Sequence, residues 1–151
     1  MPTPPARPTA NFKRRWCTQH GDLHAANILV DRKGKPVLID FGRVAESPSS
    51  LDPVTLELSL LFHPAAKALF DGWPTIDQAA SWPDLDLYTK NCPVADLIRQ
   101  CRDWVFAAPG VGDKGAYACV YSYCLRQLQF AGTNHDLAKV IAHAAIKKIL
   151  E

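Results

Sequence analysis

The segment HGDLHAANILVDRKGKPVLIDFG, residues 20–42, contains polar side chains whose types and spacing suit a chemical site. Hard cations such as Mg²⁺ prefer oxygen ligands, which Asn27 and Asp40 would supply. The carboxylate of Asp22 could accept the proton of an attacking hydroxyl group. Metal-bound phosphate oxygens and an oriented nucleophile are what phosphoryl transfer needs. The segment therefore predicts a site for that reaction.

Two short apolar runs are expected to position these residues. Residues 27–31 and 36–40 are rich in β-branched residues, and the intervening RKGK contains Gly34, which accepts a positive φ. This pattern predicts a β-hairpin with a four-residue turn. Because a hairpin brings its outer ends together, Asn27 and Asp40 should be neighbours, with Asp22 on the adjoining loop.

The remaining sequence predicts a mostly helical body. Residues 16–19 could form a short strand, and no strand is expected beyond Phe41. Asp52 and Pro53 are typical of a helix cap and first turn, so a buried helix is expected over 54–63. Weak helical pieces are expected over 64–92, and the apolar periodicity predicts three later helices. They begin near Pro93, before Tyr117, and after a cap at Thr133 or Asn134.

The predicted fold is accordingly α+β and mostly α, with one small hairpin and about five helices. Residues 1–11 contain four prolines and are interpreted as a flexible arm, so residues 12–151 would form a single domain. Trp73 and Trp82 are expected in the core. His63 and the other scattered histidines are given no role, and Arg43 is interpreted as a solvated side chain.

Composition limits the range of partners. The formal net charge is only +2, which gives no indication of a nucleic acid or an anionic membrane as partner. No apolar run approaches the roughly 18 residues that a membrane span needs. The five cysteines include no C-x-x-C pair and are interpreted as core residues in a reducing compartment, which predicts a cytoplasmic protein.

The motif residues also carry a resemblance. HGDLHAAN at 20–27, followed by DFG at 40–42, matches the H-x-D-x-x-x-x-N and D-F-G pattern of kinases. With Gly21 where protein kinases place Arg, the segment resembles the aminoglycoside phosphotransferase and choline kinase group. The resemblance implies a protein-kinase-like C-lobe, with the hairpin beside the catalytic loop. It also implies ATP and Mg²⁺ as cofactors and a small molecule with a hydroxyl group as acceptor.

The resemblance implies a role for each motif residue. Asp22 corresponds to the catalytic base, Asn27 to a metal ligand, and Asp40 to the main metal ligand, so Asn27 and Asp40 would hold the metal-bound nucleotide. His20 is expected to support the loop from below through backbone hydrogen bonds. His24 lies within the loop, where contact with substrate and simple hydrogen bonding in the loop both stay open.

Only 19 residues precede His20, too few for the N-lobe that kinase catalysis also uses. No glycine-rich loop followed by a strand lysine is found, and PGVGDKG at 109–115 is interpreted as a linker. We therefore expect an isolated C-lobe that binds ATP weakly or not at all without an N-lobe or a partner chain. Apolar surface exposed around the hairpin and Trp16 would also permit a homo-oligomer.

A second interpretation stays open. The chain could be a non-catalytic, kinase-like interaction module that retains the metal-site residues without turnover. Ternary-complex-associated domains of bacterial conflict systems resemble this lobe and would be an example. A complete set of motif residues favours descent from an enzyme, whereas the missing N-lobe favours inactivity of this polypeptide.

Overall fold

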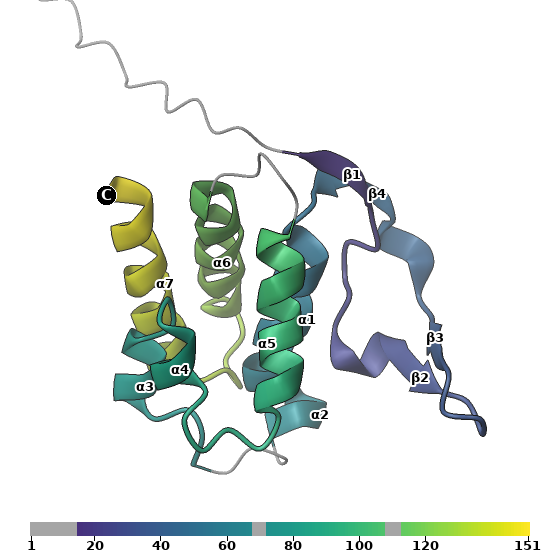
Figure 1. The fold of residues 1–151 in the computed structure, drawn as a ribbon, viewed down its shortest axis with the longest axis horizontal. Coiled ribbons are helices and arrows are strands. Elements are labelled where there is room, and N and C mark those ends of the chain that lie inside the picture. The colour runs from purple at the N-terminus through teal and green to yellow at the C-terminus, as the bar shows by residue number, and fades with distance from the viewer. Residues whose placement is uncertain (1–14, 68–71, 108–112) are drawn as a thin grey trace, which may run out of the picture.

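The computed structural model describes residues 15–67, 72–107 and 113–151 (Figure 1). These residues form four short strands: β1 (Trp16–Gln19), β2 (Ile28–Val30), β3 (Pro36–Leu38) and β4 (Ala45–Pro48). They also form seven α-helices: α1 (Leu51–Phe62), α2 (Pro64–Lys67), α3 (Ile76–Ala80), α4 (Leu85–Tyr88), α5 (Ala95–Phe106), α6 (Asp113–Gln127) and α7 (His135–Leu150). The arm predicted over residues 1–11 and most of the linker predicted over 109–115 lie outside the described residues.

The predicted hairpin is confirmed. Strands β2 and β3 pair antiparallel, with Ile28 opposite Leu38. The Asp31 carboxylate closes the turn by accepting hydrogen bonds from the backbone N–H groups of Lys33 and Lys35, both at 2.8 Å. Gly34 adopts the left-handed conformation that the turn requires, with φ of 78°.

The expectation of no strand beyond Phe41 is wrong. Strand β4 pairs antiparallel with β1, which the sequence did predict, and Gln19 lies opposite Ala45. The Thr18 hydroxyl also donates to the Glu46 carboxylate across this pair, at 2.9 Å. Residues 45–48 show no apolar alternation and end in proline, so nothing local marks them as a strand. The pairing with β1, far away in the sequence, determines their conformation.

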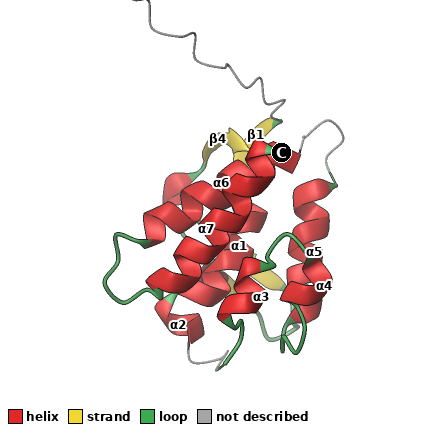
Figure 2. Cartoon of the chain, turned by 90° about the vertical axis from the view of Figure 1, so that its left-hand side faces the viewer, coloured by secondary structure: helices red, strands yellow, loops and turns green. Residues whose placement is uncertain are grey.

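The four long helices α1, α5, α6 and α7 lie side by side and share the core (Figures 1 and 2). The apolar stripes that the sequence indicates point inward. The central buried side chains are Val54, Leu58, Ile98, Val105, Val120, Cys124, Ile141 and Ala145. The last helix begins at the predicted cap, because the Asn134 side chain accepts a hydrogen bond from the Leu137 N–H.

The prediction of about five helices is too low for the described residues. The difference lies in the connector over 64–92, where α2, α3 and α4 are only four or five residues long. Helices of that length carry no full apolar period, so capping residues identify them better than periodicity does. Thr75 and Gln78 form a capping box at α3, and Asp84 caps α4.

The tryptophans lie where the sequence placed them, whereas the cysteines do so only in part: Cys101 and Cys124 are buried, but Cys17, Cys92 and Cys119 are only partly buried. None of the five cysteines, all within the described residues, forms a disulfide. Burial raises the pKa of Cys101 and of Cys124 to about 12, so both remain protonated thiols. Trp73 and Trp82 are buried in the core. None of the described helices has the length and apolar character needed to cross a membrane.

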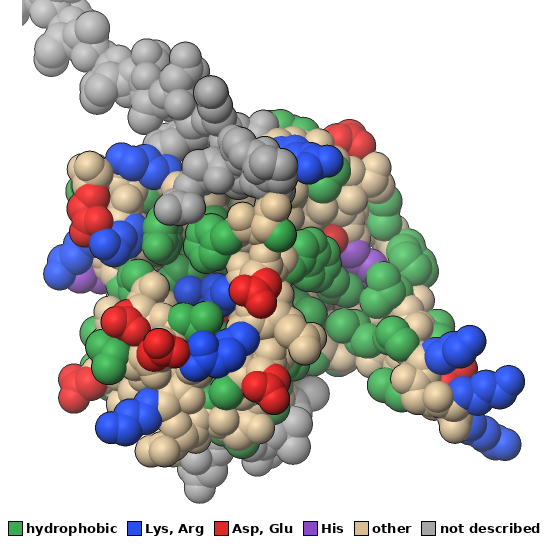
Figure 3. All heavy atoms as spheres, viewed as in Figure 1, with side chains coloured by type: hydrophobic (Ala, Val, Ile, Leu, Met, Phe, Trp, Pro, Cys, Tyr) green, Lys and Arg blue, Asp and Glu red, His purple; other side chains and the backbone are tan. Residues whose placement is uncertain are grey.

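The hairpin projects away from the helices and exposes apolar side chains (Figure 3). Exposure of apolar surface around the hairpin and Trp16 is thus as predicted, with Val30 69% exposed. The exposed apolar residues of this region are Trp16, Leu29, Val30, Val37, Leu38, Ile39, Phe41 and Val44. Basic residues at the tip, Arg32, Lys33 and Lys35, are exposed as well.

Candidate functional site

The motif loop is attached to the first turn of α1 by Asp52. Its carboxylate accepts hydrogen bonds from the backbone N–H groups of His20, at 2.6 Å, and Gly21, at 3.0 Å. The prediction that Asp52 caps its own helix is wrong, because Ser50 occupies the N-cap position. The carboxylate instead accepts hydrogen bonds from two N–H groups of the loop, and such charge-assisted bonds are stronger than hydrogen bonds between neutral groups.

Gly21 allows the loop to pass close to the segment that follows the hairpin. Its φ is 79°, and a Cβ atom at this position would lie 2.3 Å from the carbonyl oxygen of Arg43. Neither the backbone conformation nor the available space accommodates another residue. The close approach to Arg43 thus explains why glycine occupies the middle of the H-G-D triplet.

His20 connects the loop to the end of β3. Its side chain is buried, and Nε2 donates a hydrogen bond to the carbonyl oxygen of Ile39 at 2.8 Å. The ring also packs against Phe41, with centroids 5.3 Å apart. His20 is therefore placed to hold the loop and the D-F-G segment together.

Asn27 lies at the open end of the hairpin. The Ile39 N–H donates to its backbone carbonyl at 3.0 Å, so Asn27 is adjacent to the residue that precedes Asp40. Its side-chain Nδ2 donates to the carbonyl of Asp22 at 2.9 Å, which leaves the amide Oδ1 as an acceptor. Asp40 is exposed and adopts a left-handed conformation, with φ of 61°, before the short 3-10 turn Phe41–Arg43.

Two arginines flank Asp22, which is partly buried. Arg43 Nε lies 3.7 Å and Arg126 Nη2 lies 3.8 Å from the Asp22 carboxylate. Both distances exceed hydrogen-bond range, so the carboxylate interacts electrostatically with two positive charges and is hydrogen-bonded to neither. Arg43 comes from the end of the hairpin segment, whereas Arg126 comes from α6.

His24 stacks on His63, with ring centroids 4.5 Å apart. Burial lowers the pKa of His24 below its ordinary 6.5, and His63 lowers it further, while Asp22 and Asp40 act in the opposite direction. At neutral pH the net shift favours a neutral imidazole at His24.

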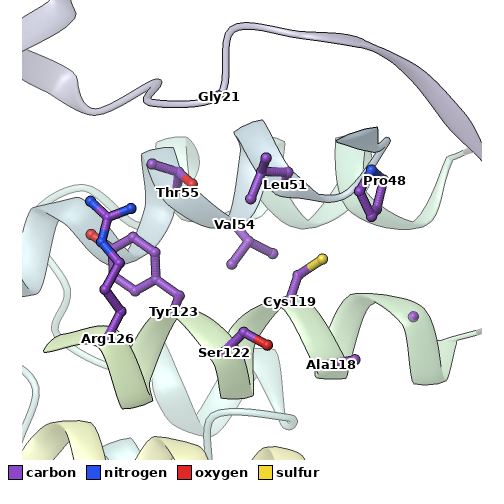
Figure 4. A pocket seen from close by; sticks show the side chains of 11 residues that line it. Gly21, Pro48, Leu51, Val54, Thr55, Ala118, Cys119, Ser122, Tyr123 and Arg126 are labelled. Atoms are coloured by element: carbon purple, nitrogen blue, oxygen red, sulfur yellow. The ribbon is translucent and has the colours of Figure 1, made fainter. Parts of the chain in front are cut away.

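Two cavities adjoin the loop. One of about 290 Å³ lies between Gly21, the first turns of α1, and α6 (Figure 4). The other, of about 380 Å³, lies on the side of Asp22 and His24. Thr55, Tyr123 and Arg126 line both cavities, so α6 forms a common wall.

Asp40 and Asn27 are the residues that could hold a divalent cation. No group of three or more His, Cys, Asp or Glu side chains within the described ranges is arranged to hold a metal ion. One exposed carboxylate and one uncommitted amide oxygen nevertheless form a donor set that suits Mg²⁺, which usually keeps several waters. The cation would lie at the open end of the hairpin, beside the loop that carries Asp22.

Sequence reasoning missed three features of this site. Asp52 was assigned to the wrong partner, and His63 and Arg126 were given no role. The Asp52-Pro53 pair was a usable signal, since an acid at a helix start can accept loop N–H groups as well as helical ones. Arg126 gave no signal, because it approaches Asp22 only through the packing of α6.

Comparison with known proteins identifies the family. A family model described as "Phosphotransferase enzyme family" matches residues 3–88, more than half of the chain. The chain belongs to this family. The match includes the loop, the hairpin and α1, which confirms the resemblance to kinase-like phosphotransferases, whereas α5, α6 and α7 lie beyond it.

Two curated relatives of this phosphotransferase chain are kinases by name. "Cyclin-dependent kinase 11" of Dictyostelium discoideum is 30% identical over 79 residues, which cover 52% of this chain and 20% of that protein. "Serine/threonine-protein kinase pelle" of Drosophila melanogaster is 49% identical over 43 residues, 28% of this chain and 8% of that protein. The chain thus spans a fifth or less of the length of either relative. No solved structure matches it significantly.

Proposed function

We propose that this chain is the C-terminal lobe of an ATP- and Mg²⁺-dependent phosphotransferase that acts on a hydroxyl group of a small molecule. Asp22 is the proposed catalytic base. Asn27 and Asp40 are the proposed metal ligands, and through the metal they hold the nucleotide. His20 and His24 support the loop.

The observation that carries this proposal is the local geometry of Asn27. Its amide nitrogen is engaged by the Asp22 carbonyl, and its backbone is bonded to the residue before Asp40. The segments that carry the two proposed metal ligands and the proposed base are therefore neighbours at one end of the hairpin. Such a neighbourhood supports the proposal, because positioning and charge stabilisation supply most of the catalysis of phosphoryl transfer.

We further propose that residues 1–151 alone are inactive or nearly so. The 151 residues contain no glycine-rich loop followed by a strand lysine, the parts that hold and neutralise the phosphates in kinases. Without them, Asp22 would face a nucleotide that is not held in line. An N-lobe, in the same polypeptide or on a partner chain, would complete the site.

A non-catalytic interaction module is the second candidate, and the exposed apolar surface of the hairpin favours it. Such a surface on a small protein often marks a contact with another protein. The same surface would also receive an N-lobe, so it does not distinguish the two candidate functions. Measurements of nucleotide binding and of turnover distinguish them.

Calorimetry with Mg-ATP tests the metal site. We expect weak binding, high-micromolar to millimolar, or about −4 to −6 kcal/mol. Asp40→Ala should abolish it, because the main metal ligand is lost. Asp86→Ala, which removes an exposed carboxylate on α4, should leave it unchanged. Tight binding that does not require magnesium would contradict the proposed metal site.

An ATP-consumption assay with a panel of small hydroxyl compounds tests turnover. The wild-type polypeptide should show none at kinase-like rates of about 1–100 s⁻¹. Added N-lobe should restore activity, and Asp22→Asn should remove that activity. Ordinary rates from residues 1–151 alone, stopped by Asp22→Asn, would show that this polypeptide is a complete enzyme.

A further inference from the structure

The cavity beside Asp22 is the place where an acceptor would reach the proposed base. Its walls come from the motif loop, from α1, from the C-terminal end of α6 and from the turn that leads to α7. Its volume of about 380 Å³ is that of a small-molecule site. The chemistry of its lining residues therefore bears on which acceptor it takes.

The charges that line this cavity are few. Asp22 is the only carboxylate among its described lining residues, and Arg126 is the only arginine or lysine. At 3.8 Å from Asp22, the guanidinium makes no hydrogen bond to it, and Arg126 forms none with any other part of the chain that the structure describes. Figure 4 shows the Arg126 side chain extending from α6 toward Thr55 of α1. Its donors are thus available to a ligand.

A second polar group lies next to Arg126. Gln127 lines the same cavity, and its amide makes no hydrogen bond within the described residues. Its amide nitrogen and oxygen are therefore available to a ligand. The remaining wall combines polar side chains with three aromatic ones, Phe62, Tyr123 and Phe130, and the ring centroids of Phe62 and Tyr123 lie 6.3 Å apart.

We propose that the acceptor is a hydroxy acid with an apolar body, whose carboxylate is bound by Arg126 and Gln127. The assignment rests on the proposed function, since it places the acceptor hydroxyl at Asp22. One planar guanidinium offers two parallel donors, which match a carboxylate. The three aromatic side chains suit the apolar body.

The same charges disfavour a polycationic acceptor. Such a compound would meet Arg126 and only one carboxylate, and Arg43 and Arg126 already flank that carboxylate. The family does not decide this question, because α6 lies beyond the segment that the family model matches. Arg126 is therefore proposed as the residue that determines acceptor specificity.

Binding without nucleotide tests this proposal separately from catalysis. The probes are matched pairs of acid and amide, lactate and lactamide, mandelate and mandelamide, phenyllactate and phenyllactamide, together with kanamycin and inorganic phosphate. Ligand-detected NMR at pH 7.5 on residues 1–151 measures each affinity. We expect mandelate or phenyllactate to bind about tenfold more tightly than its amide, equivalent to about 1.4 kcal/mol.

Two variants locate the preference. Arg126→Gln should remove the difference between acid and amide. Arg43→Gln removes the other arginine beside Asp22, does not line this cavity, and should preserve the difference. The proposal is wrong if no acid binds more tightly than its amide, if the preference survives Arg126→Gln, or if kanamycin or phosphate binds more tightly than the acids. Failure of Mg-ATP binding would contradict the proposed function, but the affinities for acid and amide could still be compared, because they are measured without nucleotide.

Discussion

The helical body and the β-hairpin place polar and apolar groups in opposite ways. The body buries an ion pair, since Arg102 Nε lies 2.6 Å from Glu57 Oε2 and both side chains are at most 5% exposed. Trp82 completes this cluster by donating to Glu57 at 2.9 Å and stacking under the Arg102 guanidinium, 3.4 Å away. The hairpin instead exposes its apolar side chains to solvent. The helical body therefore has charged groups in its interior, whereas the hairpin has apolar groups on its surface.

This contrast indicates that the two regions carry different constraints. The body is held by its own packing, whereas the hairpin depends on its turn and on its attachment to the body. The site lies where they join, through Asp52 bound to the loop and Ser59 accepting from the Ala25 N–H at 3.3 Å. Stability of the body and geometry of the site should therefore respond to different substitutions.

The largest expected effect is on the body. Arg102→Met leaves the Glu57 carboxyl group buried and without its cation. Loss of one partner of a buried pair typically costs about 3–5 kcal/mol, so the free energy of unfolding should fall by that amount. Urea denaturation followed by circular dichroism measures the change.

Arg99→Met is the matched control on the same helix. Arg99 pairs with the exposed Asp86 at 2.8 Å, and exposed pairs contribute about 0–1 kcal/mol. Equal losses for the two variants would mean that the buried cluster contributes no more than a surface pair, and the contrast between the regions would lose its energetic basis.

An intermediate effect is expected at the join. Gly21→Ala requires a left-handed alanine, which costs about 1–2 kcal/mol, and its Cβ would also meet the Arg43 carbonyl. The loop must then shift, so both stability and Mg-ATP binding should decrease. Gly34→Ala at the hairpin tip has a similar φ of 78° and no atom within 4 Å of the added Cβ.

The pair of glycine variants separates backbone strain from site geometry. Gly34→Ala should lose only the conformational part and should bind Mg-ATP like the wild type. Calorimetry and thermal unfolding on both variants measure the two quantities. If Gly34→Ala weakened binding as much as Gly21→Ala, the site would not depend on the close approach at Gly21.

The same division explains what the sequence could predict. The hairpin and the long helices follow from local patterns: Gly34 in the turn, apolar periodicity, and the cap at Asn134. The grouping of Asn27 with the end of β3 followed from the hairpin alone. Features that depend on distant partners were missed or misassigned. Strand β4 exists because β1 pairs with it, and Arg126 reaches Asp22 only after α6 has packed.

Asp52 shows how a correct local signal can give a wrong role. An acid before a proline at a helix start is a good cap, and a helix does begin close by, at Leu51. Its carboxylate binds the loop instead, because the N–H groups of His20 and Gly21 lie within reach once the chain folds. Sequence patterns identified the polar residue, and tertiary contacts determined its partner.

The smallest expected effect is a pH dependence at His24. Burial and His63 lower the pKa of His24 below 6.5, so the unfolded chain binds a proton more readily than the folded one. The resulting stabilisation is fully present above about pH 6.5 and is lost as the pH falls through the folded-state pKa. Asp22 and Asp40 oppose the shift, and His20 adds to it weakly, which keeps the effect small.

Urea unfolding at pH 7.5 and pH 5.5 measures this term. Wild-type protein should lose more stability on acidification than His24→Gln, which has no imidazole to protonate at this position. His143→Gln, on the exposed face of α7, should lose as much stability as the wild type.

NMR titration of the His24 ring in the folded protein gives the sign of its pKa shift directly, because a midpoint above 6.5 would mean that the nearby carboxylates outweigh burial and His63. In that case His24 would be charged near neutral pH, and the wall that it forms beside Asp22 would attract the acid group of an acceptor instead of packing against its apolar body.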